Sequence, residues 1–181
     1  PALAPRRALE GLGALRSLDL SANGLAVLPP SLAALEALES LDVSGNALAA
    51  LRLVDLACLP RLRRAAFADN RLSLLEAADH GVRELDLAGN ALATLAGLAG
   101  SAELVSLDAS RNALAAPPEN LLALCPKLKA ARLGGNPWAD RKFARACEAG
   151  GKATMDALRG GASKRRAKRA AAAAAPRPAR L

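Results

Sequence analysis

The chain's single histidine, His80, is the first candidate for chemistry because it follows Asp79 directly. An Asp–His pair can activate a nucleophile, but that nucleophile must lie within hydrogen-bonding reach of the imidazole. No serine or cysteine stands out near this pair in the sequence, and Asp and His are both common in turns. We therefore interpret His80 as a turn residue with a local hydrogen bond, and we predict no catalytic residue.

Other arrangements that could support chemistry are incomplete. One histidine and three scattered cysteines, Cys58, Cys125 and Cys147, do not have the spacing of metal ligands. Gly11 and Gly13 lack the third glycine and the lysine of phosphate-binding loops. Three distant cysteines also make a poor disulfide framework, which favours free buried thiols in a reducing compartment. The sequence predicts no enzyme activity, no cofactor and no metal.

Positive charge is concentrated in the last part of the chain. Residues 1–137 hold 13 basic and 14 acidic side chains, a net of −1, whereas residues 138–181 hold 12 and 3, a net of +9. Five of these basic side chains indicate a nuclear-import or nucleic-acid patch. No aromatic residue is interleaved, so an RNA contact would involve phosphates only; a disordered, solvated linker is the compatible alternative. The patch consists of Lys164, Arg165, Arg166, Lys168 and Arg169.

A repeated pattern of aliphatic residues must position any functional surface. The pattern L-x-x-L-x-L-x-x-N-x-L starts at residues 15, 38, 62, 82, 104 and 128, so one copy follows another every 20 to 24 residues. Side chains alternate along a strand, so the residues on either side of x in L-x-L face inward. One repeat cannot bury that face alone, and stacked repeats cover it for one another. The asparagines of the pattern are Asn23, Asn46, Asn70, Asn90, Asn112 and Asn136.

This pattern resembles that of the leucine-rich-repeat family over roughly residues 11–138. The resemblance implies an α/β fold, a curved right-handed solenoid with a parallel sheet on its concave face. Six repeats would occupy residues 1–137, and the first half-repeat is a candidate for truncation. We expect residues 138–160 to form a helical C-terminal cap and residues 161–181 a basic low-complexity tail or linker. The family's secreted members often place a cysteine cluster after Asn-Pro-Trp, which residues 139–142 lack, so this chain is expected to be intracellular.

Details of the repeat give further expectations. The Asn side chains should satisfy backbone groups of neighbouring coils, since an amide both donates and accepts hydrogen bonds. Prolines after Leu28 and Ala116 suit the start of short helices. Leu9 and Leu12 should face the core. In the cap, Phe143 with Cys147, and Met155 with Leu158, should cover the last coil.

The concave face is the predicted partner-binding surface. Four aspartates form an interrupted acidic column that could meet a basic partner, although exposed charges in such repeats commonly do no more than solvate. The face lacks the aromatic anchors common at interfaces, so the rim or the cap is the alternative. Its charged candidates are Asp19, Asp42, Arg64, Glu84, Asp86, Asp108 and Arg132.

The final third resembles a narrower family, that of leucine-rich repeat-containing protein forty-seven. The similar residues are Cys125 to Lys129, Gly135-Asn136, Asp140 to Phe143, and Leu158 to Gly161 followed by the basic run. Pro137 and Trp138 depart from that family's pattern. In that family a repeat domain precedes a domain like part of the phenylalanyl-tRNA synthetase β subunit. Membership would imply a cytosolic setting associated with translation or RNA.

Taken together, the residues predict a non-catalytic protein–protein interaction scaffold, a module of a larger intracellular protein. One alternative is an RNA- or ribosome-associated module acting through the basic cap and tail. A second is a structural adaptor in a cytoskeletal or ciliary assembly. No apolar run long enough to span a membrane and no signal peptide is visible, and we expect no small-molecule substrate. The expected location is the cytoplasm, with the nucleus or cilium as alternatives.

Overall fold

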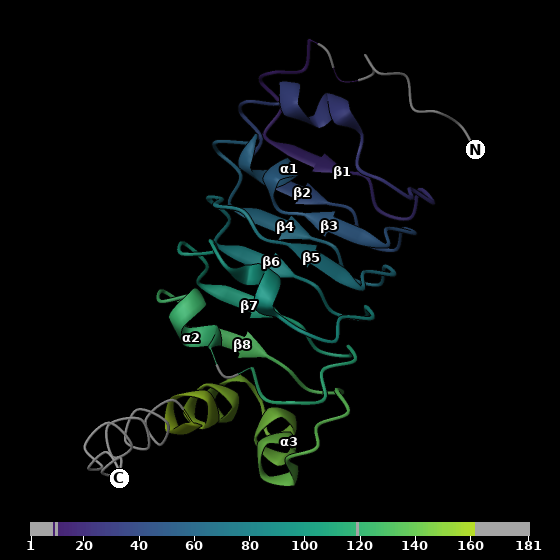
Figure 1. Cartoon of the computed structure of the whole chain (residues 1–181). Helices are drawn as coiled ribbons and strands as arrows, with labels where there is room; N and C mark the ends of the chain where they lie inside the picture. Colours follow the sequence, from purple (N-terminus) through teal and green to yellow (C-terminus); the bar gives the residue numbers. More distant parts are fainter. Residues whose placement is uncertain (1–8, 10, 119, 162–181) are drawn as a thin grey trace, which may run out of the picture.

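The repeats form one parallel sheet in the computed structural model, which describes residue 9, residues 11–118 and residues 120–161. The sheet has six strands in the order β1-β2-β4-β6-β7-β8, one from each repeat (Figure 1). The strands are β1 (Ser17–Asp19), β2 (Ser40–Asp42), β4 (Arg64–Ala66), β6 (Glu84–Asp86), β7 (Ser106–Asp108) and β8 (Ala130–Arg132).

The register places equivalent residues of successive repeats side by side. Leu18 pairs with Leu41, and Leu85 pairs with Leu107. In each of the last five strands the central residue is buried and its two neighbours are not. Alternation of side chains along a strand produces this pattern, and it confirms that the repeats stack through their aliphatic residues.

The core lies behind the sheet and runs from one coil to the next. Leucines of the pattern such as Leu38, Leu62 and Leu104 are 0% exposed, and Phe67 is the largest of the fully buried side chains. Each such leucine contributes about 1.5–3 kcal/mol by leaving water. Burial of this row across all the repeats is what holds the coils together.

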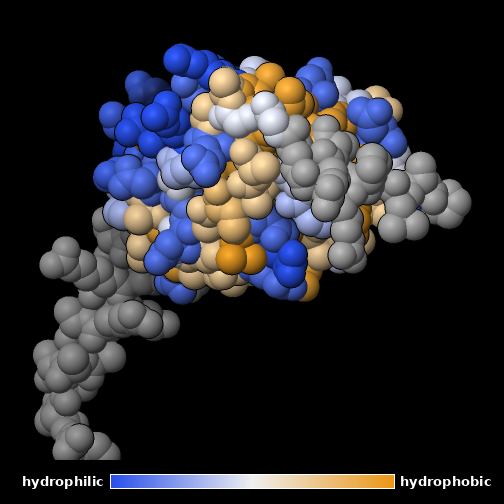
Figure 2. All heavy atoms as spheres, turned by 90° about the horizontal axis from the view of Figure 1, so that it is seen from above, coloured by the Kyte–Doolittle hydropathy of each residue, from blue (hydrophilic) through white to orange (hydrophobic). Residues whose placement is uncertain are grey.

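The first coil is less well covered than the others. Leu15, Leu18 and Leu20 are only partly buried, whereas their counterparts in the next coil lie within the core. Figure 2 looks down on this end and shows apolar side chains reaching the surface among hydrophilic ones. Leu9 packs against the core, but the expectation that Leu12 does so is wrong, because Leu12 is 46% exposed.

Outside the main sheet, the connecting segments are mostly short turns. The sequence did not predict that β3 (Ala50–Arg52) and β5 (Leu74–Glu76) pair in a second, two-stranded parallel sheet. After Leu28 a helical turn begins at Pro30, as predicted, whereas after Ala116 the helical turn begins only at Leu121, beyond both prolines. The helical turns are η1 (Pro30–Ala34), α1 (Val54–Ala57), η2 (Ala96–Leu98) and α2 (Leu121–Leu124).

Two longer helices follow β8. Helix α3 (Arg141–Glu148) begins at Asp140, whose carboxylate accepts hydrogen bonds from the first-turn amides of Lys142 and Phe143. Phe143 and Cys147 are both buried, in agreement with their predicted shared face. Residues 151–161 form a second helix, from which Met155 and Leu158 join the core. Both helices lie at the β8 end of the stack (Figure 1).

Candidate functional site

The solvent-exposed face of the six-stranded sheet carries all seven charged residues that the sequence singled out. Asp19, Arg64, Glu84 and Arg132 are exposed, and Asp42, Asp86 and Asp108 are half-buried. The register aligns them in two adjacent rows, one through Ser17, Ser40, Arg64, Glu84, Ser106 and Ala130, the other through Asp19, Asp42, Ala66, Asp86, Asp108 and Arg132.

The four aspartates have a local structural role that sequence reasoning missed. In each case Oδ1 accepts a hydrogen bond from the backbone N–H two residues later, at 2.8–2.9 Å. Ser110 also donates its hydroxyl to the same oxygen of Asp108, at 2.6 Å. These bonds satisfy amides where the chain leaves the strand. The signal was visible as Asp at the same place in four repeats, followed by the corner toward Asn.

Two cross-strand ion pairs neutralise some of the charge on this face. Arg64 Nε lies 3.6 Å from Glu84 Oε2, and Arg132 Nη1 lies 3.7 Å from Asp108 Oδ2. Burial, opposed by the amide of Ala88, raises the pKa of Asp86, and the nearby carboxylates add to this. The Arg64–Glu84 pair is exposed and both pairs are long, so each contributes little. The paired charges therefore lie opposite each other on neighbouring strands, and each can pair with a charge of a partner instead.

Strands β2, β4, β6, β7 and β8 also enclose a shallow hollow on this face. Its volume is about 340 Å³, and Asp42, Arg64, Asp86 and Arg132 are among the side chains around it. Such a hollow can admit side chains of a partner, whereas a small ligand needs enclosure by apolar walls.

The asparagine column behaves as predicted. In each coil after the first, the Asn Nδ2 donates to a backbone carbonyl of the preceding coil, and Oδ1 accepts an amide from that coil. Asn70, for example, donates to Val43 O at 3.0 Å and accepts from Leu48 N at 3.1 Å. These amides are committed to the backbone, so the column links coils and offers no ligand site.

His80 has a partner that the sequence did not reveal. Its Nε2 lies 2.9 Å from Ser101 Oγ, which belongs to the next coil and is fully buried. The Val82 amide donates to Nδ1, so Nε2 carries the proton and donates to the serine. A catalytic histidine would need Nδ1–H bonded to a carboxylate and an accessible hydroxyl. The arrangement is a buried polar link between coils, and burial lowers the pKa of His80 despite nearby Asp79.

The cysteines have no shared site. Cys125 and Cys147 are buried, and burial raises the pKa of each thiol to about 11. The expectation of buried thiols is wrong for Cys58, which is exposed. Over the described part of the chain, no group of three potential metal ligands occurs, and no helix is both long and apolar enough to cross a bilayer.

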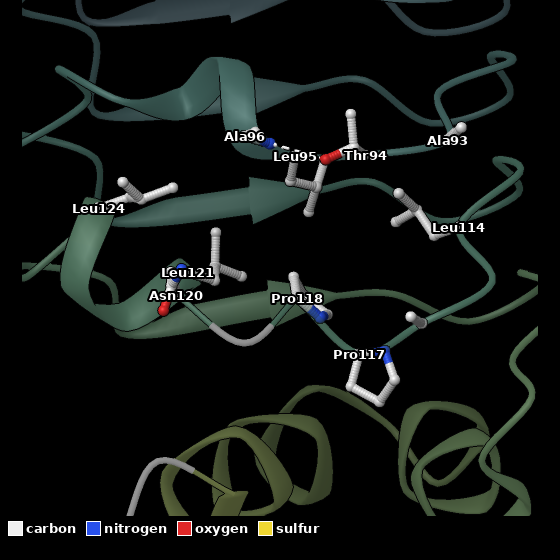
Figure 3. Close-up of a pocket in the computed structure, with 11 residues that line it drawn as sticks. Ala93, Thr94, Leu95, Ala96, Leu114, Pro117, Pro118, Asn120, Leu121 and Leu124 are labelled. Atoms are coloured by element: carbon white, nitrogen blue, oxygen red, sulfur yellow. Dashed lines mark hydrogen bonds between the residues drawn. The ribbon is translucent and has the colours of Figure 1, made fainter. Parts of the chain in front are cut away.

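An apolar hollow of about 410 Å³ lies between η2 and α2 (Figure 3). Leu95, Leu114, Pro117 and Leu121 are among its walls, and Asn120 is one of its few polar side chains. Among its described walls there is no acid, base or nucleophilic thiol, so these walls offer shape and apolar contact. The basic patch at Lys164, Arg165, Arg166, Lys168 and Arg169 lies outside the described residues.

Comparison with protein families supports leucine-rich repeats in this chain. The family model described as leucine rich repeat matches residues 13–72. Domains of this kind have a parallel sheet with few helices, commonly mediate protein–protein interaction and are typically non-catalytic. A search of curated proteins found no match to the chain. The narrower resemblance of the final third thus has no support from a homologue.

Proposed function

We propose that this chain is a non-catalytic scaffold that binds protein partners through the exposed face of its six-stranded sheet. The repeats would form a curved right-handed solenoid with that face on the concave side, followed by the cap and by a basic tail at residues 161–181. The module would belong to a larger intracellular protein in the cytoplasm.

One observation carries the proposal: a parallel sheet leaves one face open to solvent. Parallel sheets are normally covered on both faces. Here the central residue of each of the last five strands is buried, while the flanking residues point to solvent and include charged side chains in register. A partner can therefore contact several consecutive strands at once, and its charges can exchange with weak cross-strand pairs such as Arg64–Glu84.

The test compares two charge-reversal variants in affinity capture followed by cross-linking. Asp86→Lys with Asp108→Lys alters the exposed face, whereas Glu36→Lys alters an exposed residue between η1 and β2. Both aspartates also bond backbone amides, so thermal unfolding first checks that the double variant folds. We then expect specific partners to be lost with the double variant and kept with Glu36→Lys, and cross-links to fall on the sheet face. Identical partner sets for both variants would refute use of this face.

The concentration of positive charge after residue 137 favours a second candidate, an RNA- or ribosome-associated module. The narrower family resemblance points the same way. RNA binding by the full chain that disappears when Lys164, Arg165 and Arg166 are replaced by glutamine would support it. A cytoskeletal or ciliary adaptor would instead co-sediment with microtubules and not with ribosomes.

A further inference from the structure

A second groove lies where helix 151–161 meets the end of the sheet. It has a volume of about 560 Å³ and lies between strands β7 and β8 on one side and the helix on the other. The helix starts close to the sheet, since a Cβ built on Gly151 would lie 3.5 Å from Ala131 O. Met155, 3% exposed, belongs to both the groove lining and the core.

Basic side chains outnumber acidic ones in this groove. Strands β7 and β8 contribute Asp108 and Arg132, and Lys129 lies directly before β8. The helix contributes Lys152, Asp156 and Arg159, whose spacing of four and three residues places them on one face. The lining therefore holds four cations and two anions.

The existing ion pairs leave the lysines available. Asp108 pairs with Arg132 at 3.7 Å, and Asp156 pairs with Arg159 at 3.6 Å. Among the described residues neither Lys129 nor Lys152 takes part in an ion pair, and both are exposed. Both pairs are long, and both arginine side chains are at least 60% exposed, so the pairs contribute little and the arginines can turn to a stronger acceptor.

We propose that the groove formed by Lys129, Arg132, Lys152 and Arg159 binds an acidic, extended peptide segment of a partner protein. The inference rests on the proposed protein-binding function and extends the exposed sheet face at its β8 end, with which the groove shares Asp108 and Arg132. Glutamate or aspartate side chains of the segment meet the lysines and arginines. The backbone N–H groups of the segment donate to the carboxylates of Asp108 and Asp156. A peptide can bind both kinds of side chain because it carries hydrogen-bond donors and acceptors together.

The same lining disfavours nucleic acid. A phosphate backbone offers acceptors without donors, so the carboxylates of Asp108 and Asp156 would repel it. No aromatic side chain lines the groove, so bases would find no stacking surface. The chemistry of the walls selects a peptide over RNA.

The test is an NMR titration of the isotope-labelled full chain with a peptide in which glutamate alternates with glycine. We expect amide shifts concentrated in β7, β8 and residues 151–159, and no shifts with the matching glutamine peptide. Lys129→Glu with Lys152→Glu should weaken binding about tenfold, because exposed charge contacts contribute modestly. Lys142→Glu, on exposed helix α3, should change it by less than about twofold.

Three results would overturn the inference: no shifts at millimolar peptide, shifts confined to residues 162–181, or oligouridine RNA binding the groove more tightly than the peptide. Thermal unfolding checks that the double variant folds, and Lys129→Gln with Lys152→Gln serves if it does not. Two results would separate this groove from the rest of the sheet face. In one, Lys129→Glu with Lys152→Glu abolishes peptide binding whereas Asp86→Lys leaves it unchanged. In the other, the double lysine variant still captures protein partners although it no longer binds the peptide.

Discussion

Replacing Asn70 with alanine tests how the coils are joined. The Asn70 amide is 9% exposed and bonds both its own coil and the preceding one. It donates to Val43 O at 3.0 Å and Phe67 O at 3.1 Å, and it accepts from Leu48 N at 3.1 Å. Asn70→Ala removes all of these bonds while leaving the backbone in place.

The cost can be worked out group by group. Val43 O and Phe67 O keep second donors, because Asn46 and Asn90 also bond to them. The Leu48 amide has Asn70 Oδ1 as its hydrogen-bond acceptor and would lose it. An orphaned buried N–H costs about 1–3 kcal/mol, and the lost amide bonds add about 1 kcal/mol. We therefore expect Asn70→Ala to lower the free energy of unfolding by about 2–4 kcal/mol.

Asn23 supplies the matched control. It stands at the same place in the first coil, is exposed, and among the described residues its side chain donates to Ser21 O alone, at 2.9 Å. Asn23→Ala should cost less than about 0.5 kcal/mol, as exposed substitutions usually do. Urea unfolding of both full-length variants, with midpoint and slope fitted, measures the difference. Equal losses for Asn23→Ala and Asn70→Ala would refute the coil-linking role of the column.

Four other changes follow from the packing and from the buried histidine. Leu107→Ala should lower stability by about 2–5 kcal/mol in urea unfolding, because it leaves a cavity in the core row. Gly97→Ala should cost about 1–3 kcal/mol, since a Cβ there would lie 2.2 Å from a β5 carbonyl oxygen, whereas Gly160→Ala, with open space around it, should lower the melting temperature little or not at all. Ala22→Gly should raise the free energy of unfolding by about 0.5–1 kcal/mol, and with it the melting temperature, because Ala22 has φ 54°, which favours glycine. Burial lowers the pKa of His80 below its unfolded value, so neutral His80 stabilises the fold above about pH 6.5 and that stability is lost as pH falls. A free energy of unfolding that stays constant from about pH 7.5 to 5.5 would contradict this, and His80→Gln should remove the pH dependence.

The repeating part of the fold could be predicted because the spacing of leucines within each repeat indicates which side chains are buried. Leucines two residues apart must share a face in a strand, and only stacking covers them. The same logic identified Asp86 and Asp108 as outward-facing neighbours and the Asn column as a link between coils. The coil-to-coil register followed from the pattern without knowledge of any contact.

Features that the repeat pattern does not encode could not be predicted in this way. The His80–Ser101 bond joins residues 21 positions apart, and neither has a repeat counterpart that signals it. Pairing of β3 with β5 depends on two neighbouring connecting segments being extended at the same time. The groove beside Lys152 exists because the helix of residues 151–161 lies at the end of the sheet. The repeat pattern ends before this helix and does not set its position.

Spin-label distances test whether one strand from each repeat joins a single sheet. Labels at Ser17→Cys on β1 and Ala130→Cys on β8, in a Cys58→Ser background, lie five strand spacings apart. Cys125 and Cys147 stay unlabelled because they are buried. At about 4.8 Å for each spacing, we expect one population near 24 Å between the backbones. A separation far beyond this, or a broad spread of distances, would contradict the stacked sheet.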